Sequence, residues 1–337
     1  MRILSLFDGI ACWYEALVKA GIKIDAYYAS EIDKYAIQIA QKNHPDIIQV
    51  GDICKLNGEE FRDIDLVIGG SPCQWFSVAG KMLNFEDPRS KLFFEFVRIL
   101  KEVKPKYFLL ENVKMKKERQ DIISERLGVE PIEINSGLVS GQNRKRLYRT
   151  NIPGVIQPED KGIILKDILQ KNVEEKYYYS KERWEAVISN PHNYDFLKRL
   201  ENINGKCNTL TTVTWGNQEK KIEELLSMVD GELRIREATK KWYSVAEEGD
   251  GISLSFSNSA PSRKGIRIGK ANTLTCSWES YVYNTRIRKL TPVECERLQT
   301  LPDNYTEGVS DTQRYKALGN GWTVDVIAHI FSFIPKD

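Results

Sequence analysis

The amino-acid sequence predicts an α/β fold, in which a mostly parallel sheet has helices on both faces and a smaller irregular domain is attached. Over about the first 110 residues, apolar runs alternate with amphipathic helical runs, as in parallel βαβ units. This rhythm stops at about Asn151, and strong helical patterning returns at about residue 286. A polar segment therefore interrupts the sheet domain.

The expected strands cover residues 2–7, 25–32, 47–53, 65–70 and 106–113, and the expected helices cover 13–21, 33–43 and 90–103. A further helix is expected to start at Pro292, because Thr291 can cap it and proline suits a first helical position. The strands run into "FDGI", "SEID", "GDI", "GGSPCQ" and "ENV". Ligands bind at the carboxyl ends of parallel strands, so we expect these groups to form one site.

Three segments follow from this pattern. Residues 1–150 form the sheet domain, 151–285 form the irregular domain, and 286–337 return to the sheet domain. The irregular domain carries two related units, "KCNTLTTVTWGN" (206–217) and "KANTLTCSWESY" (270–281). Two copies are too few for a solenoid, so we interpret them as paired strand-turn units.

Composition narrows the class of protein. Of 337 residues, 41% are hydrophobic and 28% charged, which is ordinary for a soluble globular protein with a sizeable core. No apolar run is long enough to span a membrane, so we expect a cytoplasmic protein without a membrane partner. Six cysteines without a CxxC pair and three histidines argue against a disulfide framework and a metal site. The net charge of +2 permits an anionic partner.

Cys73 follows a strand and a Gly-Gly-Ser-Pro turn, so its sulfur is expected in a loop above the sheet. A buried structural cysteine is the alternative. Glu111 favours chemistry, because a carboxylate at the end of an apolar strand has little structural reason to be there. A thiol and a carboxyl over one cleft suit attack on an electron-poor ring whose nitrogen the acid holds or protonates.

Arg144 and Arg146 stand two apart in "QNRKRLY" and would share one face of a strand. Paired arginines make bidentate contacts to carboxylates, phosphates or base edges. A solvated basic face is the alternative interpretation.

The amino-terminal strand ends in a turn with one glycine, whereas a dinucleotide fingerprint would need three. The following helix start can receive a carboxylate. Glu31 is placed to take ribose hydroxyls, and Asp52 to accept from an exocyclic amine such as that of adenine. A nucleoside with an amino-acid tail fits these groups better than a pyrophosphate, which describes S-adenosylmethionine.

Eight motifs together resemble the DNA (cytosine-5) methyltransferases of phages and bacteria, and "FDGIA" is also similar to the catalytic domains of vertebrate de novo enzymes. They are "FDGI", "SEID", "GDI", "GGSPCQ", "ENV", "QNRKRLY", "RKLTPVECERLQ" and "GNGWTV", in the family's order. The resemblance covers roughly residues 1–150 and 286–337. It implies a Rossmann-like methyltransferase sheet, an S-adenosylmethionine-dependent enzyme and double-stranded DNA as substrate. It also implies base flipping, a place in restriction–modification, and a bacterial or phage-infected host cell; we expect a monomer.

The resemblance implies roles at matching positions. Cys73 would be the nucleophile, with Pro72 shaping its loop. Glu111 would hold cytosine N3, Arg146 would contact O2, and Arg144 would support the site. The cofactor would be bound by Phe7, Asp8, Gly9, Ile10, Glu31, Ile32, Asp52, Ile53 and Asn320. Residues 151–285 would be the target-recognition domain.

Two tryptophans depart from the family pattern. Trp75 stands two residues after Cys73, where a small residue is usual, and Trp13 stands beside the cofactor loop. Trp75 is interpreted as a sign of altered substrate handling or reduced activity, and Trp13 either reshapes the cofactor site or packs behind it. The alternatives are therefore a catalytically impaired DNA-binding relative and a tRNA cytosine-5 methyltransferase, with an NAD enzyme a distant third.

Overall fold

The computed structural model describes residues 1–70, 88–178, 200–201, 205–210, 221–225, 233–236, 243–246, 251–253, 265–267, 280–282 and 285–335. The chain divides into two compact units. Unit 1 comprises Met1–Ile168, Asn208–Thr214 and Pro292–Asp337, and unit 2 comprises Leu169–Cys207 and Trp215–Thr291. None of the described helices is long and apolar enough to cross a membrane.

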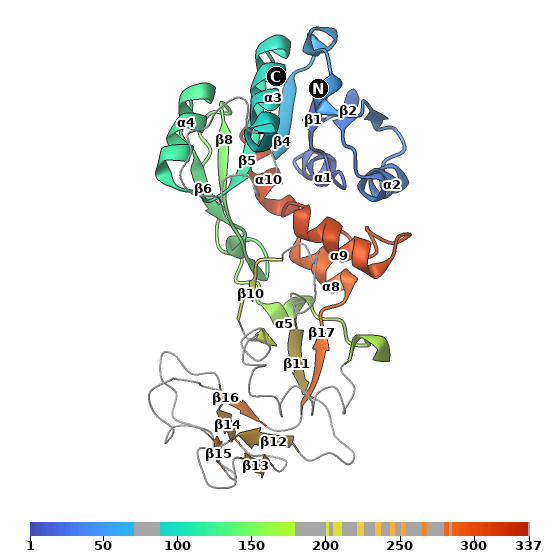
Figure 1. The fold of residues 1–337 in the computed structure, drawn as a ribbon, viewed down its shortest axis with the longest axis vertical. Helices are drawn as coiled ribbons and strands as arrows, with labels where there is room; N and C mark the ends of the chain where they lie inside the picture. The colour runs from blue at the N-terminus through green and yellow to red at the C-terminus, as the bar shows by residue number, and fades with distance from the viewer. Residues whose placement is uncertain are drawn as a thin grey trace. The chain divides into compact units, whose positions relative to one another are not determined.

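Unit 1 is built on a seven-stranded sheet in the order β3-β2-β1-β4-β5-β8-β6 (Figure 1). Its strands are β1 (Arg2–Leu6), β2 (Ala26–Ser30), β3 (Ile48–Gln49), β4 (Leu66–Gly70), β5 (Tyr107–Val113), β6 (Ile132–Asn135) and β8 (Lys145–Thr150). The first five are parallel to one another, and β8 runs antiparallel to both β5 and β6. The predicted mostly parallel α/β sheet is confirmed.

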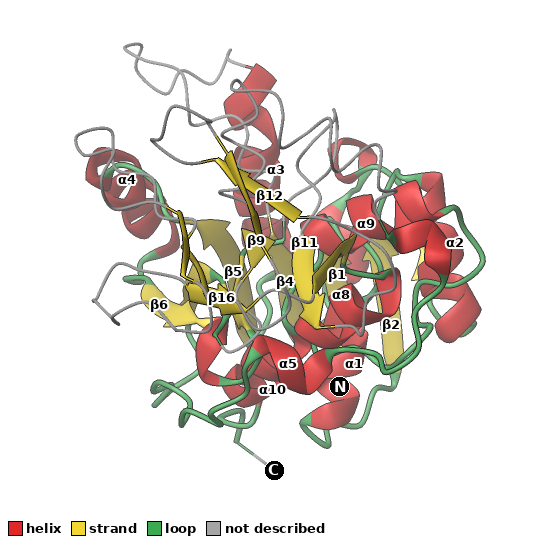
Figure 2. Cartoon of the chain, turned by 90° about the horizontal axis from the view of Figure 1, so that it is seen from below, coloured by secondary structure: helices red, strands yellow, loops and turns green. Residues whose placement is uncertain are grey.

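Helices cover both faces of this sheet. Those of unit 1 are α1 (Cys12–Lys19), α2 (Lys34–Asn43), α3 (Pro88–Val103), α4 (Lys117–Leu127), α5 (Leu165–Ile168), α8 (Pro292–Leu298), α9 (Asp311–Asn320) and α10 (Val324–Phe331). In Figure 2, α3 and α4 lie on one side of the sheet, and α1 and α10 lie on the other. The helix expected to start at Pro292 does so.

The core under α3 shows why the sequence folds this way. Phe93, Phe96 and Val97 of α3 are buried at the spacing that gives a helix one apolar face. They pack with Leu4, Leu6 and other apolar strand residues in one cluster. Because both sheet faces are covered, the strands are mainly apolar, and polar residues gather where they run out at the carboxyl edge.

Unit 2 contains short strands. They are β9 (Leu200–Glu201), β11 (Lys221–Leu225), β12 (Leu233–Arg236), β13 (Tyr243–Ala246), β14 (Gly251–Ser253), β15 (Gly265–Arg267), β16 (Ser280–Val282) and β17 (Thr285–Lys289). They form separate small sheets, β17-β11-β9, β12-β13 and β15-β14-β16. Two further short strands of the chain are β7 (Gln142–Asn143) and β10 (Cys207–Asn208).

Candidate active site

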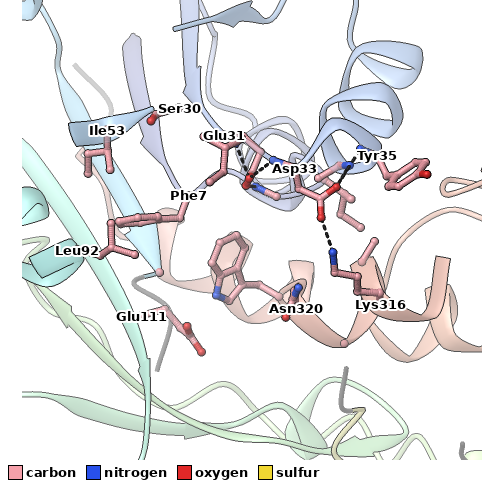
Figure 3. Close-up of a pocket in the computed structure, with 18 of the residues that line it drawn as sticks. Phe7, Ser30, Glu31, Asp33, Tyr35, Ile53, Leu92, Glu111, Lys316 and Asn320 are labelled. Atoms are coloured by element: carbon pink, nitrogen blue, oxygen red, sulfur yellow. Dashed lines mark hydrogen bonds and ion pairs between the residues drawn. The ribbon is translucent and has the colours of Figure 1, made fainter. Parts of the chain in front are cut away.

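A cavity of about 480 Å³ lies in unit 1 at the carboxyl ends of its parallel strands (Figure 3). Its wall combines the ends of β1, β2, β4 and β5 with β8 and α9. The predicted site residues on that wall are Phe7, Gly9, Ile10, Glu31, Ile32, Asp52, Ile53, Glu111, Arg144, Arg146 and Asn320. Segments more than 300 residues apart in the sequence therefore meet at one edge of the sheet.

Glu31 is held rigidly at one end of this cavity. Its carboxylate accepts hydrogen bonds from the backbone N–H groups of Gly9 (2.8 Å), Ile32 (2.7 Å) and Asp33 (2.8 Å). Charge-assisted bonds of this kind are strong and fix the carboxylate in place. The Glu31 oxygen lone pairs that are not used in these three bonds can accept hydrogen bonds from hydroxyl groups of a ligand.

The loop that follows β1 has an unusual backbone. Phe7, Gly9 and Ala11 all have a positive φ, at 58°, 63° and 61°. Such values are uncommon for residues other than glycine, and they turn the chain sharply between β1 and α1. The side chain of Asp8 points away from the cavity wall, where it accepts hydrogen bonds from the hydroxyls of Ser5 (2.5 Å) and Tyr27 (2.6 Å).

Two indole rings pack against each other at the cavity, one on its wall and one behind it. Trp322 lines it, and the rings of Trp322 and Trp13 lie 4.4 Å apart at 45°. A Cβ placed on Gly70 would come within 2.3 Å of the Trp322 ring, so the end of β4 has to be glycine for the indole to fit. Trp13 is fully buried and packs behind Trp322, the second of the two positions foreseen for it.

Glu111 and Arg146 form the polar wall at the other end of the cavity. Glu111 is 6% exposed, and its Oε1 lies 2.8 Å from Arg146 Nε. They come from neighbouring strands, since Val113 of β5 pairs with Arg146 of β8. This arrangement offers an acid and a planar cation side by side, able to hold adjacent polar atoms of one ring.

Arg144 has a different surrounding. It is 4% exposed, and its guanidinium donates to the carbonyl oxygens of Leu210 (3.0 Å), Gly321 (2.9 Å) and Gly319 (3.3 Å). Burial lowers the pKa of Arg144 to about 10, and the positive charge of Arg146 is the second cause of this shift. Arg144 therefore braces the 319–321 turn from behind while also lining the cavity.

Cys73, Pro72 and Trp75 lie outside the described residues. The chain is described up to Gly70, the last residue of β4, which lines the cavity. Cys73 follows three residues later in the sequence.

Several wall residues lie outside the site that the sequence predicts. Lys316 lines the cavity from α9, and its Nζ lies 2.7 Å from Asp33 Oδ2. Asp33 also caps α2 by accepting from the backbone N–H groups of Tyr35 and Ala36. A cap pattern before α2 could have identified Asp33, whereas Lys316 is 283 residues away and no local pattern relates the two. Trp322 lies within the "GNGWTV" motif, in which only Asn320 is assigned a role from the sequence.

The residues present suit a nucleoside-type ligand. The cavity volume lies within the roughly 300–1,000 Å³ of small-molecule sites. Carboxylates of Glu31 and Asp52 can accept hydroxyl and amine hydrogens, and Phe7, Ile53 and Trp322 supply apolar surface. The wall thus matches S-adenosylmethionine in chemistry and size. Among the described residues, no group of three or more histidine, cysteine, aspartate or glutamate side chains could hold a metal ion.

Residues 1–125 and 137–336 match the model of a family described as C-5 cytosine-specific DNA methylase. The chain belongs to this family. Type II methyltransferase M1.ScrFI of Lactococcus lactis subsp. cremoris is 31% identical over 326 residues, which cover 90% of this chain and 70% of that protein. Orphan methyltransferase M.SPRI of Bacillus phage SPR is 27% identical over 434 residues, which cover 98% and 96%.

Solved structures with a similar fold are also methyltransferases by their titles. The solved structure of the Entamoeba histolytica methyltransferase EhMeth is similar with a TM-score of 0.69 at 17% identity, over 99% of this chain and 97% of that one. The predicted family, enzyme class and cofactor are therefore confirmed. This DNA (cytosine-5-)-methyltransferase uses S-adenosylmethionine to methylate cytosine in DNA.

Proposed function

We propose that this methyltransferase flips its target cytosine out of double-stranded DNA and attacks it through a covalent Cys73–C6 adduct. The observation that supports this most is the Glu111–Arg146 pair, which shares one cavity with Glu31 and Asn320. A ring carbon inside a duplex cannot be reached, so the base must leave the stack at a cost of roughly a few kcal/mol.

The chemistry follows from the proposed roles. The Cys73 thiolate forms a bond to C6, and the electron pair of the C5–C6 double bond makes C5 nucleophilic. Glu111 holds or protonates N3 and so stabilises the enamine, while Arg146 contacts O2 and Pro72 shapes the cysteine loop. S-Adenosylmethionine, when bound, supplies the electrophilic methyl group that C5 takes. A base then removes the C5 proton, the C6–sulfur bond breaks, and the thiolate is restored.

The cofactor is assigned to the other end of the cavity. In this proposal Glu31 accepts ribose hydroxyls, and Asp52 and Ile53 bind the adenine. Phe7, Gly9, Ile10, Ile32 and Asn320 close the walls, as supported by their place in the cavity lining. Asp8 would act by holding the cofactor loop through Ser5 and Tyr27, and Arg144 by supporting the 319–321 turn.

We further propose that residues 151–285 read the DNA sequence and that residues 1–150 and 286–337 carry the chemistry. Every described residue of the cavity wall belongs to the latter two segments, which supports the division. The same observation supports action as a monomer, because one chain supplies all of the wall that the structure describes. The proposed location is the cytoplasm of a bacterial or phage-infected cell, where such DNA is found.

The test is to incubate the protein with methyl-labelled S-adenosylmethionine and either mixed genomic DNA or tRNA, and to identify the product nucleoside by mass. We expect 5-methylcytosine in DNA, and no transfer by Cys73→Ala. Cys54→Ala, the same change at a cysteine outside the proposed chemistry, is expected to retain activity. Glu111→Gln is expected to slow single-turnover transfer about 10²–10⁴-fold with unchanged cofactor affinity.

Other outcomes would identify the alternatives. Transfer to tRNA instead of DNA would make the chain a tRNA methyltransferase. Salt-dependent DNA binding without any transfer would make it a catalytically impaired relative, with Trp75 the first residue to replace. Full activity of Cys73→Ala would contradict the covalent mechanism.

A further inference from the structure

We propose that Lys114, Lys116, Lys117 and Lys145 form a phosphate-binding patch that grips the DNA backbone beside the flipped nucleotide. We call these four residues the lysine patch. This inference rests on the proposed function, because it needs duplex DNA at the Glu111 end of the cavity.

The position of the patch follows from strand register. Glu111 and Arg146, the proposed base-contacting pair, stand on β5 and β8, and Val113 pairs with Arg146 across these strands. Lys114 follows Val113, and Lys145 precedes Arg146. The two lysines therefore continue the same two strands past the cavity wall, at the edge where the base has to enter.

The lysine side chains reach solvent. The exposed fraction of the side chain is 64% for Lys114, 84% for Lys117 and 63% for Lys145, and Lys116 is exposed too. Like charges that face each other across strands destabilise a sheet. Here Glu133 lies between them, with its carboxylate 2.8 Å from Lys114 Nζ and 3.9 Å from Lys145 Nζ.

Two acids, Glu133 and Asp121, pair with the lysine patch and do not neutralise all four lysines. Glu133 serves two lysines, and Lys117 pairs with Asp121 at 2.9 Å. Exposed ion pairs of this kind contribute little and are screened by salt. A polyanion can therefore displace them.

Cap and dipole preferences do not explain Lys116 and Lys117, although Lys117 gains a local pair with Asp121 four residues on. Lys116 occupies the N-cap of α4 without a side-chain cap hydrogen bond, and Lys117 is the first residue of that helix. Serine, threonine, aspartate and asparagine are preferred at an N-cap, and cations are unfavourable at the positive end of the helix dipole. An anionic partner at this edge accounts for lysines where the helix itself disfavours them.

Duplex DNA supplies that partner at the right place. A flipped nucleotide stays joined to its 5′ and 3′ phosphates, so phosphates must lie close to the mouth of the base pocket. Lys114 is three residues beyond Glu111, about 10 Å along an extended strand. Lysine contacts to phosphate position a protein on DNA without reading its sequence, which fits a patch next to the chemistry.

The salt dependence of DNA binding tests the proposal. The full chain would be titrated with a fluorescein-labelled, mixed-sequence duplex, and the association constant measured from about 50 to 200 mM salt. Each phosphate contact contributes about 0.9 to the slope of log K against log salt. We expect Lys114→Gln with Lys116→Gln to lower the magnitude of the slope by about 2, with affinity for S-adenosylmethionine unchanged.

Two single variants control the experiment. Lys23→Gln removes a lysine that is 89% exposed and paired to Asp25, at the opposite, amino-terminal end of β2, and is expected to keep the wild-type slope. Glu133→Gln removes the acid between Lys114 and Lys145 and is expected to tighten DNA binding. A fall of about 1 in the slope of Lys23→Gln, half that expected of the double variant, would show an effect of total charge and overturn the patch.

The outcomes separate this inference from the proposed function. A wild-type slope in the double variant, with DNA methylation retained, overturns the patch and leaves the proposed function standing. A wild-type protein that binds tRNA but not the duplex overturns both.

Discussion

At the scale of single residues, Asp8 carries a carboxyl group that is wholly buried behind the cofactor loop. Burial raises its pKa to about 6, although the hydroxyls of Ser5 and Tyr27 act in the opposite direction. Its Oδ2 has no hydrogen-bond partner among the described residues. Burying an ionised carboxylate is costly unless its oxygens are satisfied, so between about pH 4 and 6 the folded protein holds a proton here that the unfolded chain has already lost.

This linkage predicts how stability depends on pH. Because the pKa of Asp8 is about 6 in the fold and 3.8 in the unfolded chain, its protonated form favours folding below about pH 4. That contribution is lost as the pH rises through 6, and the total is of the order of 3 kcal/mol. Asp8→Asn removes the titration, so its unfolding free energy relative to wild type is expected to rise between pH 4 and 7 in urea denaturation.

Tyr27→Phe is the control for this prediction. It removes one hydrogen bond to Asp8 but keeps the carboxyl group, so the pH dependence between 4 and 7 should remain or steepen. A flat profile in wild type would show that Asp8 stays ionised in the fold.

At the scale of elements, Arg144 joins parts of unit 1 that are distant in the sequence. Its carbonyl partners lie in the 208–210 segment and in the 319–321 turn at the end of α9. Gln142 holds the same segment, since its Oε1 accepts from the Leu210 N–H at 2.7 Å. The position of this part of the cavity wall therefore depends on a guanidinium that reaches several carbonyl groups at once.

We expect Arg144→Lys to weaken S-adenosylmethionine binding about tenfold or more in calorimetry. A lysine ammonium is a point charge and cannot reproduce the planar fork of an arginine, and each lost charged hydrogen bond costs about 1.5–3 kcal/mol. Arg149→Lys is the matched variant. Arg149 is equally buried but alternates to the other face of β8, where it contacts Ser124 and Gln120.

The expected result for Arg149→Lys is lower thermal stability with unchanged cofactor affinity. If both variants lose cofactor affinity equally, the effect of Arg144 is general destabilisation rather than support of the 319–321 turn.

Element boundaries show where local pattern was sufficient. The expected strand at 65–70 and helix at 90–103 occur as Leu66–Gly70 and Pro88–Val103. The spacing of apolar residues along the chain is sufficient to predict a buried parallel strand and an amphipathic helix. The expected strand at 47–53 is shorter, with only Ile48–Gln49 in the sheet. Gly51 then turns the chain with a φ of 80°, and Asp52 caps a 3₁₀ turn through its bond to the Cys54 N–H, so the chain has left the sheet before residue 53.

At the scale of the whole molecule, all the described residues that line the cavity belong to unit 1. A ligand that binds only the native state adds about 2.7 kcal/mol at a concentration of 100 Kd. Hydrogen exchange with and without S-adenosylmethionine should therefore slow in the strands and helices of unit 1. Exchange in β11, β12 and β13 should not change. Equal protection of those strands would place unit 2 in the cofactor site and contradict the proposed division.

The sequence by itself determined the family, the α/β class and the set of motifs whose residues line the cavity. These properties reside in short segments, since apolar periodicity forms strands and helices locally and each strand end carries its own polar group. Only the tertiary structure decided which side chains meet. The Glu111–Arg146 contact depends on the register of β5 against β8, and the Lys316–Asp33 contact on α9 returning beside α2. Such pairings are set by long-range packing, which no local pattern contains.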